Sequence, residues 1–454
     1  MKFTLIFASA FLTSAAAAIP GFHNFPKAPD LPEPGQLALV LSENEFEDYL
    51  DKWLESEGAK YMNASADLRS GCSIRVRGDL GQPQPVYIRR GTYLLPNGNT
   101  GNIVLPTGEQ VLIACTGPSR TIRHPNIAAT VNTATATCVN NALVSGHGWL
   151  SGHSEFGGLT CSNHAFHEAQ GTSETCWNRN MVIRVGFIVQ GTFHPWFWSC
   201  FDRNRLEVIY VWYDQTPENM LHQTGVDRPS WMAGSFFPGV NINQLYTQVQ
   251  QRATIASIVG NQLANKYITS TQFLARGHLA ARSDFVFATA QRATFYFINA
   301  APQWQPFNAG NWNWLEQNLR TRIGTAGYRT VIYTGTFGVT QLRNQQNRLV
   351  DIYLHRDSNN NPQLPVPLYF YKVVYDESRR IGTAFISINN PYYTLAEARA
   401  LQFCTDRCRG NSAFNWLSWQ PDRIDLGYSF CCDVNEFRRT VPHLPSFTVN
   451  GLLS

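Results

Sequence analysis

The chain has 454 residues, of which 44% are hydrophobic and twelve are Trp, a composition that excludes an intrinsically disordered protein. Residues 1–67 hold ten acidic and four basic side chains, so residues 68–454 keep 22 of the 32 acidic and 32 of the 36 basic residues, a net charge of +10. A basic body favours a polyanionic partner, although charge alone is equally compatible with an ordinary basic secreted protein.

Residues 1–18 have the pattern of a secretory signal peptide. Lys2 supplies the positive start, residues 3–12 form a short apolar run, and alanines at 15–18 provide the small side chains of a cleavage site. The apolar run is too short to span a bilayer and no later stretch is long enough, so we expect no membrane partner.

Residues 19–67 combine a proline-rich start with an acidic stretch at 44–61, whose apolar side chains recur at helical spacing. We predict a propeptide whose acidic helix covers a basic cleft until proteolysis. A solubilising helix docked elsewhere on the surface is the alternative. Asn63 begins a single glycosylation sequon.

Ten cysteines, an even number, predict five disulfide bonds in an oxidising compartment. They form an early group and a late group: Cys72, Cys115, Cys138, Cys161, Cys176 and Cys200, then Cys404, Cys408, Cys431 and Cys432. Neighbouring cysteines pair with each other only under strain, so Cys431 and Cys432 should each bond to one of Cys404 and Cys408. Zinc is the weaker alternative for the late group, and a metal site at Cys161, His164 and His167 is likewise less favoured than a disulfide.

At this length two folded units are expected, and the expected secondary structure changes near residue 200. Residues 68–200 predict a disulfide-rich β module, with short apolar runs at 86–88, 111–113 and 181–189. Residues 201–454 alternate strands with helices. The expected strands are 206–213, 285–288, 330–333, 369–375 and 383–388, and the expected helices are 309–323 and 394–404. Thr394 and Glu397 form a capping-box pattern at the start of the last helix.

The helix expected at 309–323 carries polar side chains at defined positions. Trp312, Leu315, Leu319 and Ile323 fall on one helical stripe with Asn308 at its head, and Gly324 is expected to end the helix. Glu316 and Arg320 lie on the flank, one turn apart. Taken singly, Asn308 could be an ordinary N-cap, and Glu316 with Arg320 a surface ion pair.

Considered together with Arg276-Gly277-His278, these residues indicate a functional site. The combination resembles the DNA/RNA non-specific endonucleases, the ββα-metal or His-Me finger nucleases. The pattern of that family maps onto Arg276-Gly277-His278, Asn299, Pro302-Gln303, Asn308, Glu316 and Arg320. Blocks such as FLARGHLAARSDFVFATAQRATFYFINAAPQWQPFN and PVPLYFYKVVYD, with the late cysteine group, resemble secreted arthropod gut nucleases over roughly residues 70–454. These include insect enzymes that degrade double-stranded RNA. Ala275 departs from the family pattern, in which many members place Asp.

The resemblance implies an α+β fold, in which a ββα-metal nuclease domain (201–454) with a central antiparallel sheet and flanking helices follows the disulfide-rich module. It also implies a Mg²⁺ cofactor, or Mn²⁺ in its place, held by Asn308, with His278, Arg276, Glu316 and Arg320 catalytic. The imidazole would take a proton from water and the guanidinium groups would bind phosphate. Asn299 and Gln303 would orient these groups, and Arg228 is a weaker candidate for phosphate binding.

The function so implied is secreted, sequence-non-specific cleavage of double-stranded RNA and of DNA in the gut lumen or digestive fluid, with 5′-phosphate products. Contacts to phosphate and metal rather than to base edges make cleavage indifferent to sequence. A catalytically inactive nucleic-acid-binding or uptake protein on the same fold is the alternative, and an adhesive or lectin-like protein explains only the disulfide-rich half. The sequence does not indicate an oligomeric state.

Overall fold

The structure, a computed structural model, describes residues 71–146 and 149–454. The expected signal peptide, the propeptide and Asn63 lie outside these residues. Two large antiparallel sheets organise the described chain, one of six strands and one of eight. None of the helices found within the described ranges is both long and apolar enough to cross a lipid bilayer.

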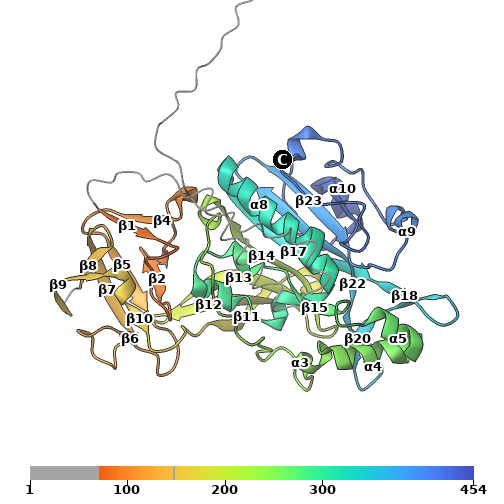
Figure 1. Cartoon of the computed structure of the whole chain (residues 1–454), viewed down its shortest axis with the longest axis horizontal. Helices are drawn as coiled ribbons and strands as arrows, with labels where there is room; N and C mark the ends of the chain where they lie inside the picture. The colour runs from red at the N-terminus through yellow and green to blue at the C-terminus, as the bar shows by residue number, and fades with distance from the viewer. Residues whose placement is uncertain (1–70, 147–148) are drawn as a thin grey trace, which may run out of the picture. The chain divides into compact units, whose positions relative to one another are not determined.

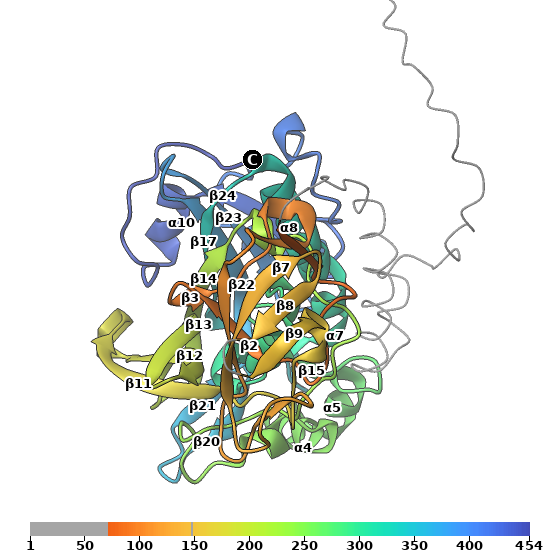
Figure 2. The same cartoon turned by 90° about the vertical axis from the view of Figure 1, so that its left-hand side faces the viewer.

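The six-stranded sheet forms the disulfide-rich β module, in the order β3-β2-β5-β7-β8-β9. Figure 2 shows β7, β8 and β9 side by side. Cys72–Cys138 and Cys115–Cys161 link its strands and loops around a core of their own. The strands of the module are β1 (Cys72–Arg75), β2 (Val86–Arg89), β3 (Thr92–Tyr93), β4 (Asn102–Leu105), β5 (Gln110–Ala114), β6 (Ile122–Arg123), β7 (Thr133–Asn140), β8 (Leu143–Gly146), β9 (Leu150–Glu155) and β10 (Thr160–Cys161).

The eight-stranded sheet is the centre of the second unit, in the order β11-β12-β13-β14-β17-β22-β23-β24, with antiparallel neighbours throughout. It confirms the central antiparallel sheet expected of the fold. Its strands are β11 (Glu168–Thr175), β12 (Met181–Val189), β13 (Thr192–Asp202), β14 (Glu207–Gln215), β17 (Thr330–Val339), β22 (Pro367–Asp376), β23 (Ile381–Ile388) and β24 (Ser429–Asp433).

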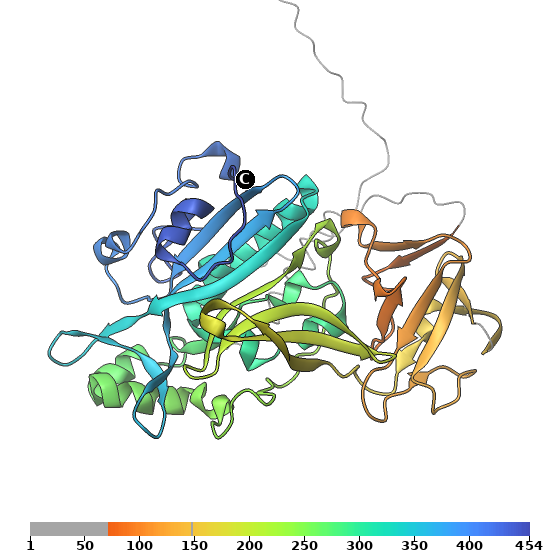
Figure 3. The ribbon, with the colours of Figure 1, turned by 180° about the vertical axis from the view of Figure 1, so that it is seen from behind.

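Side chains alternate across this sheet, as the period of two in a strand requires. On β14, Val211 and Tyr213 face one core, whereas Tyr210 and Trp212 face another. The first core also receives α8 (Asn313–Ala326), which Figure 1 shows lying along the sheet. The second core is closed by α9 (Leu395–Ala400) and α10 (Val434–Thr440), and Figure 3 shows α10, in dark blue, on that side.

The remaining elements connect the strands of the large sheet or flank it. They include α3 (Ile242–Leu245), α4 (Gln248–Val259), α5 (Asn261–Tyr267), β15 (Leu274–His278), η6 (Arg282–Asp284), α6 (Ala288–Ala293), η7 (Phe297–Asn299), β16 (Ala300–Trp304), α7 (Gln305–Phe307), η8 (Asn308–Trp312), β18 (Gln341–Arg343), β19 (Leu349–Asp351), β20 (Tyr353–Arg356) and β21 (Pro362–Pro365). The antiparallel pair β15–β16 followed by α8 is the ββα motif.

The late cysteines pair as Cys404–Cys432 and Cys408–Cys431, which confirms the expectation that the neighbours bond elsewhere. A zinc site in this group is wrong, because all four sulfurs are oxidised. Cys161 is likewise bonded to Cys115, which removes it from the alternative metal site with the nearby histidines. Cys176–Cys200, the fifth bond, links the segment that follows β11 to the inner strand β13.

Several sequence expectations about elements were wrong, including the end of the last expected helix, since α9 ends at Ala400 rather than at residue 404. Residues 285–288 do not form a strand: Phe285, Val286 and Phe287 are buried in a connecting segment, because a short apolar run can fill a core in any backbone conformation. Gly324 does not end its helix, which runs to Ala326 and is capped by Gly327 at φ 70°. Gly324 instead gives Met220 close access, since an added Cβ would lie 2.6 Å from the Met220 Cβ.

The boundary expected at residue 200 also needs another position. Strands β11 and β12 precede residue 200 and β13 spans it, yet all three pair in the same sheet as the strands that follow. We therefore propose that the disulfide-rich module ends near residue 165, just before β11.

Candidate active site

The first strand of the ββα motif carries Arg276 and His278 on one face, because residues two apart in a strand point the same way. Gly277 between them faces the opposite side, where it lies against the buried Gln303 on β16. A Cβ on residue 277 would lie 2.2 Å from the Gln303 Oε1 atom. Glycine is therefore the residue that allows β15 and β16 to pair at this point with Gln303 in place.

His278 stands in an aromatic enclosure. Its ring centroid lies 4.6 Å from that of Trp231 and 4.9 Å from that of Phe295. The Nε2 atom is buried and has no hydrogen-bond partner among the described residues. Burial lowers the pKa of His278 well below 6.5, and the positive charges of Arg228 and Arg282 lower it further. The imidazole is thus neutral at neutral pH and carries a nitrogen that is open to a proton.

The same aromatic group holds two arginines. The guanidinium of Arg276 lies over the rings of Tyr246 and Phe297, 5.5 Å and 5.8 Å from their centroids. Arg228 lies 5.6 Å from the centroid of Phe295, the ring that also contacts His278. The structure therefore brings Arg228 to the site, although its sequence context was a weak indication.

Asn299 is fully buried and fixes the chain immediately after His278. Its Oδ1 atom accepts a hydrogen bond from the Ala280 amide at 2.8 Å, and its Nδ2 atom donates to the carbonyls of Ala280 and Thr294 at 3.0 Å and 2.9 Å. This geometry is consistent with the positioning role predicted for Asn299, and it leaves the buried amide no access to a substrate.

Asn308 lies on a π-helical turn, η8, rather than on the regular helix that the sequence predicted from about residue 309. Such turns are often found at functional sites. Asn311 anchors the turn: its Nδ2 atom donates to the carbonyls of Gln420 and Gly427, at 2.9 Å and 2.6 Å. Asn308 itself is half-buried, and its side chain forms no hydrogen bond within the described ranges. Its amide oxygen is therefore available as a ligand.

Arg320 does not form the surface ion pair with Glu316 that its spacing allowed. Its Nη1 atom lies 2.8 Å from the Asp284 Oδ1 atom, and the two side chains are 3% and 1% exposed. A guanidinium so enclosed is poorly placed to bind a phosphate. The structure therefore corrects the expectation that Arg320 contacts the phosphate: Arg320 forms a buried ion pair that joins α8 to η6.

This ion pair extends into a polar network inside the core, centred on Asp284. The Tyr213 hydroxyl donates to the Asp284 Oδ2 atom at 2.6 Å. The Lys372 ammonium, fully buried, donates to Tyr213 and to Thr334 at 3.2 Å and 2.9 Å. Burial lowers the pKa of Lys372, and the charge of Asp284 opposes that effect. Sequence patterns did not indicate Asp284, Lys372 or Tyr213 as parts of the site.

Glu316 borders the network and is half-buried, with an enclosed Oε1 atom that has no partner among the described residues. Burial raises the pKa of Glu316 to about 8, an effect that Lys372 opposes and Asp284 reinforces. A nearby cation would favour the ionised carboxylate. The donors present, one neutral amide oxygen at Asn308 and the Oε1 atom of Glu316, fit a hard divalent ion that prefers oxygen.

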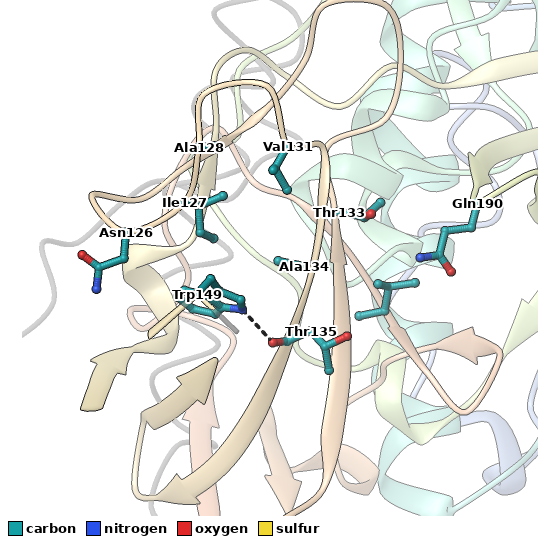
Figure 4. Close-up of a pocket in the computed structure, with 10 residues that line it drawn as sticks. Asn126, Ile127, Ala128, Val131, Thr133, Ala134, Thr135, Trp149 and Gln190 are labelled. Atoms are coloured by element: carbon teal, nitrogen blue, oxygen red, sulfur yellow. Dashed lines mark hydrogen bonds between the residues drawn. The ribbon is translucent and has the colours of Figure 1, made fainter. Parts of the chain in front are cut away.

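A separate pocket of about 480 Å³ opens in the disulfide-rich module (Figure 4). Its wall includes Ile127, Thr135 and Trp149, and the Trp149 indole donates to the Thr135 carbonyl at 3.0 Å. None of the residues expected to be catalytic lines this pocket, so it is distinct from the site around His278.

Residues 178–437 match the family model of the DNA/RNA non-specific endonucleases. The chain is 26% identical to a salivary endonuclease of Lutzomyia longipalpis, over 78% of this chain and 79% of that protein. It is 22% identical to the salivary protein Tsal2A of Glossina morsitans morsitans, over 84% and 94% of the two chains. A chain in the crystal structure of the EndoG/EndoGI complex aligns with a TM-score of 0.35 and 18% identity, covering 57% of this chain and 89% of that one.

Proposed function

The chain belongs to the DNA/RNA non-specific endonuclease family, and from that premise we propose that it is a secreted, Mg²⁺-dependent endonuclease. Its substrates would be double-stranded RNA and also DNA, cleaved without sequence specificity to leave 5′-phosphates. One observation supports this proposal above the others. The ββα motif presents a neutral imidazole, with an unpartnered nitrogen, beside Arg276 and Arg228.

In this proposal His278 acts as the general base, and its Nε2 atom accepts a proton from the attacking water. Arg276 and Arg228 bind the phosphate and stabilise the negative charge that grows on it during attack. Asn308 would hold the divalent ion directly, and Glu316 would hold the water around it. When bound, the ion would polarise the phosphate and stabilise the departing 3′-oxygen.

The pH dependence of cleavage tests the role of His278. Since only the neutral imidazole accepts a proton, and burial, Arg228 and Arg282 all lower its pKa, the acid limb of kcat/KM should have its midpoint below pH 6.5. Arg228→Gln removes one positive charge, so the pKa should rise and the acid limb should move to higher pH. A midpoint above 6.5 in the unmodified protein would contradict the neutral-base assignment.

Removal of the metal and a matched substrate panel test the function itself. Purified protein is incubated with single- and double-stranded RNA and DNA of one sequence, with Mg²⁺, with Mn²⁺ or with EDTA. We expect cleavage of duplex RNA and DNA with Mg²⁺ and none with EDTA, because the proposal assigns the stabilisation of the departing 3′-oxygen to the ion. The alternative, an inactive nucleic-acid-binding or uptake protein, predicts retention of the nucleic acid without cleavage under every condition.

Secretion into the gut lumen or digestive fluid is part of the proposal. It is supported by the signal-peptide pattern of residues 1–18, by the five disulfide bonds and by the salivary names of the relatives.

Residues 19–67 are proposed as an inhibitory propeptide, supported by the ten acidic side chains of that segment and by the arginines around His278. Protein that begins near residue 68 should therefore cleave faster than the chain that retains the segment, most of all at low salt, where charge attraction is least screened. Equal rates for the two forms would contradict inhibition.

A further inference from the structure

The segment of residues 221–228, here called the arginine-tied segment, leads from the end of β14 to Arg228. Three arginines bind its backbone carbonyls. Arg77 Nε donates to the His222 carbonyl at 2.7 Å, Arg282 Nη2 to that of Val226 at 3.2 Å, and Arg292 Nη1 to that of Asp227 at 2.9 Å. Charge-assisted hydrogen bonds of this kind are stronger than neutral ones, so the backbone path of the segment is fixed at three points.

One of the three arginines comes from the disulfide-rich module. Arg77 follows β1 directly, and Cys72 at the start of that strand is bonded to Cys138. The module contacts the segment a second time at Gly101, where an added Cβ would lie 2.9 Å from the Leu221 Cδ1 atom. Arg77 therefore belongs to a part of the chain that a disulfide bond constrains.

The module also contacts the elements that surround the catalytic motif. Asn99 Nδ2 donates to the carbonyl of Gly324 on α8 at 3.0 Å. Val286 and Phe287, which follow η6, are buried in the core of the module rather than in that of the large sheet. The module thus packs against the same elements that carry Asp284 and Arg320.

The far end of the arginine-tied segment reaches the catalytic histidine. Arg228 lies over Phe295, and the ring of Phe295 is 4.9 Å from that of His278. Displacement of the segment would therefore move a positive charge that faces His278. Arg77 bonds to the segment at His222, six residues before Arg228, so any effect of Arg77 on the chemistry would pass through the backbone between these two residues.

We propose that the disulfide-rich module takes part in the active site, and that Arg77 is a positioning residue which holds the arginine-tied segment so that Arg228 meets His278. The inference rests on the proposed function for its catalytic consequence, although its structural part does not depend on cleavage. It gives the module a role within the enzyme, since the bond to the His222 carbonyl comes from Arg77 of the module.

The test compares Arg77→Met, which removes the donor and keeps the aliphatic stem, with Arg75→Ala. Arg75 lies two residues before Arg77, at the end of β1, and forms an exposed ion pair with Asp79, so its loss should leave all readouts unchanged. For Arg77→Met we expect kcat to fall about tenfold or more, with duplex affinity within twofold of the unmodified protein, and Arg77→Lys to recover part of the loss. The positioning role would be overturned if Arg77→Met had the same kcat as the unmodified protein. It would also be overturned if the variant lost only duplex affinity and that affinity depended less on salt.

Hydrogen exchange followed by mass spectrometry provides a readout that does not require activity. Arg77→Met should speed exchange of the amides in residues 221–228, whereas Arg75→Ala should not. Unchanged exchange in that segment would overturn the inference even if the protein cleaved nothing. An inactive unmodified protein that nevertheless shows the change in exchange would contradict the proposed function alone. If the methionine variant does not fold, the same comparison is made with Arg77→Lys.

Discussion

Replacement of His278 by alanine should reduce kcat by about 10²–10⁴-fold, the range expected when a general base is removed. Binding of duplex nucleic acid should remain, because the arginines that address phosphate are unchanged in this variant. The measurement is single-turnover cleavage of a labelled duplex, combined with affinity measured in EDTA.

The control is His153→Ala, since His153 is exposed in the disulfide-rich module. It should cleave at the unmodified rate. Substantial cleavage by His278→Ala would show that another group accepts the proton, and the role assigned to the imidazole would be lost.

Replacement of Arg320 by alanine should destabilise the protein by about 3–5 kcal/mol, because it leaves the buried Asp284 carboxyl group without the guanidinium that lies 2.8 Å from it. Lys372, 4.0 Å from the other carboxylate oxygen, can compensate only in part. The free energy of unfolding in denaturant measures the effect, and the loss of activity should follow the loss of folded protein.

Arg329→Ala is the matched control for this variant. Arg329 forms an ion pair with Glu218, but its side chain is 66% exposed, so the pair should contribute about 0–1 kcal/mol. If Arg320→Ala kept its full stability and lost only activity, the guanidinium would act on the substrate after all, and the correction made from its burial would be wrong.

Features that depend on local periodicity were predictable from the sequence. Strands β14, β17, β22 and β23 each contain a run of apolar residues, and the stripe of Leu315, Leu319 and Ile323 on α8 follows from helical geometry alone. The pairing of the late cysteines followed from a steric argument about neighbours. Each of these inferences needed only residues that are close in sequence.

Other features depend on contacts between distant parts of the chain. Asp284 meets Arg320 across 36 residues and Tyr213 across 71, and no periodic pattern links them. The π-helical turn at Asn308 depends on bonds from Asn311 to residues more than 100 positions later. The sequence did contain one indication of Lys372, because it is a single cation in the middle of an otherwise apolar strand. A lysine buried at such a position requires a negatively charged partner inside the protein.

The placement of Val286 and Phe287 in the core of the module bears on how much of the chain is needed to fold. A fragment trimmed to the family match, residues 178–437, would retain every group assigned to the chemistry. It would also leave those two side chains without their cover, and Thr383 without its hydrogen bond to Leu453. The smallest fragment that folds is thus larger than the smallest fragment that contains all the catalytic groups. Fragments trimmed to residues 178–437 should therefore aggregate rather than cleave nucleic acid.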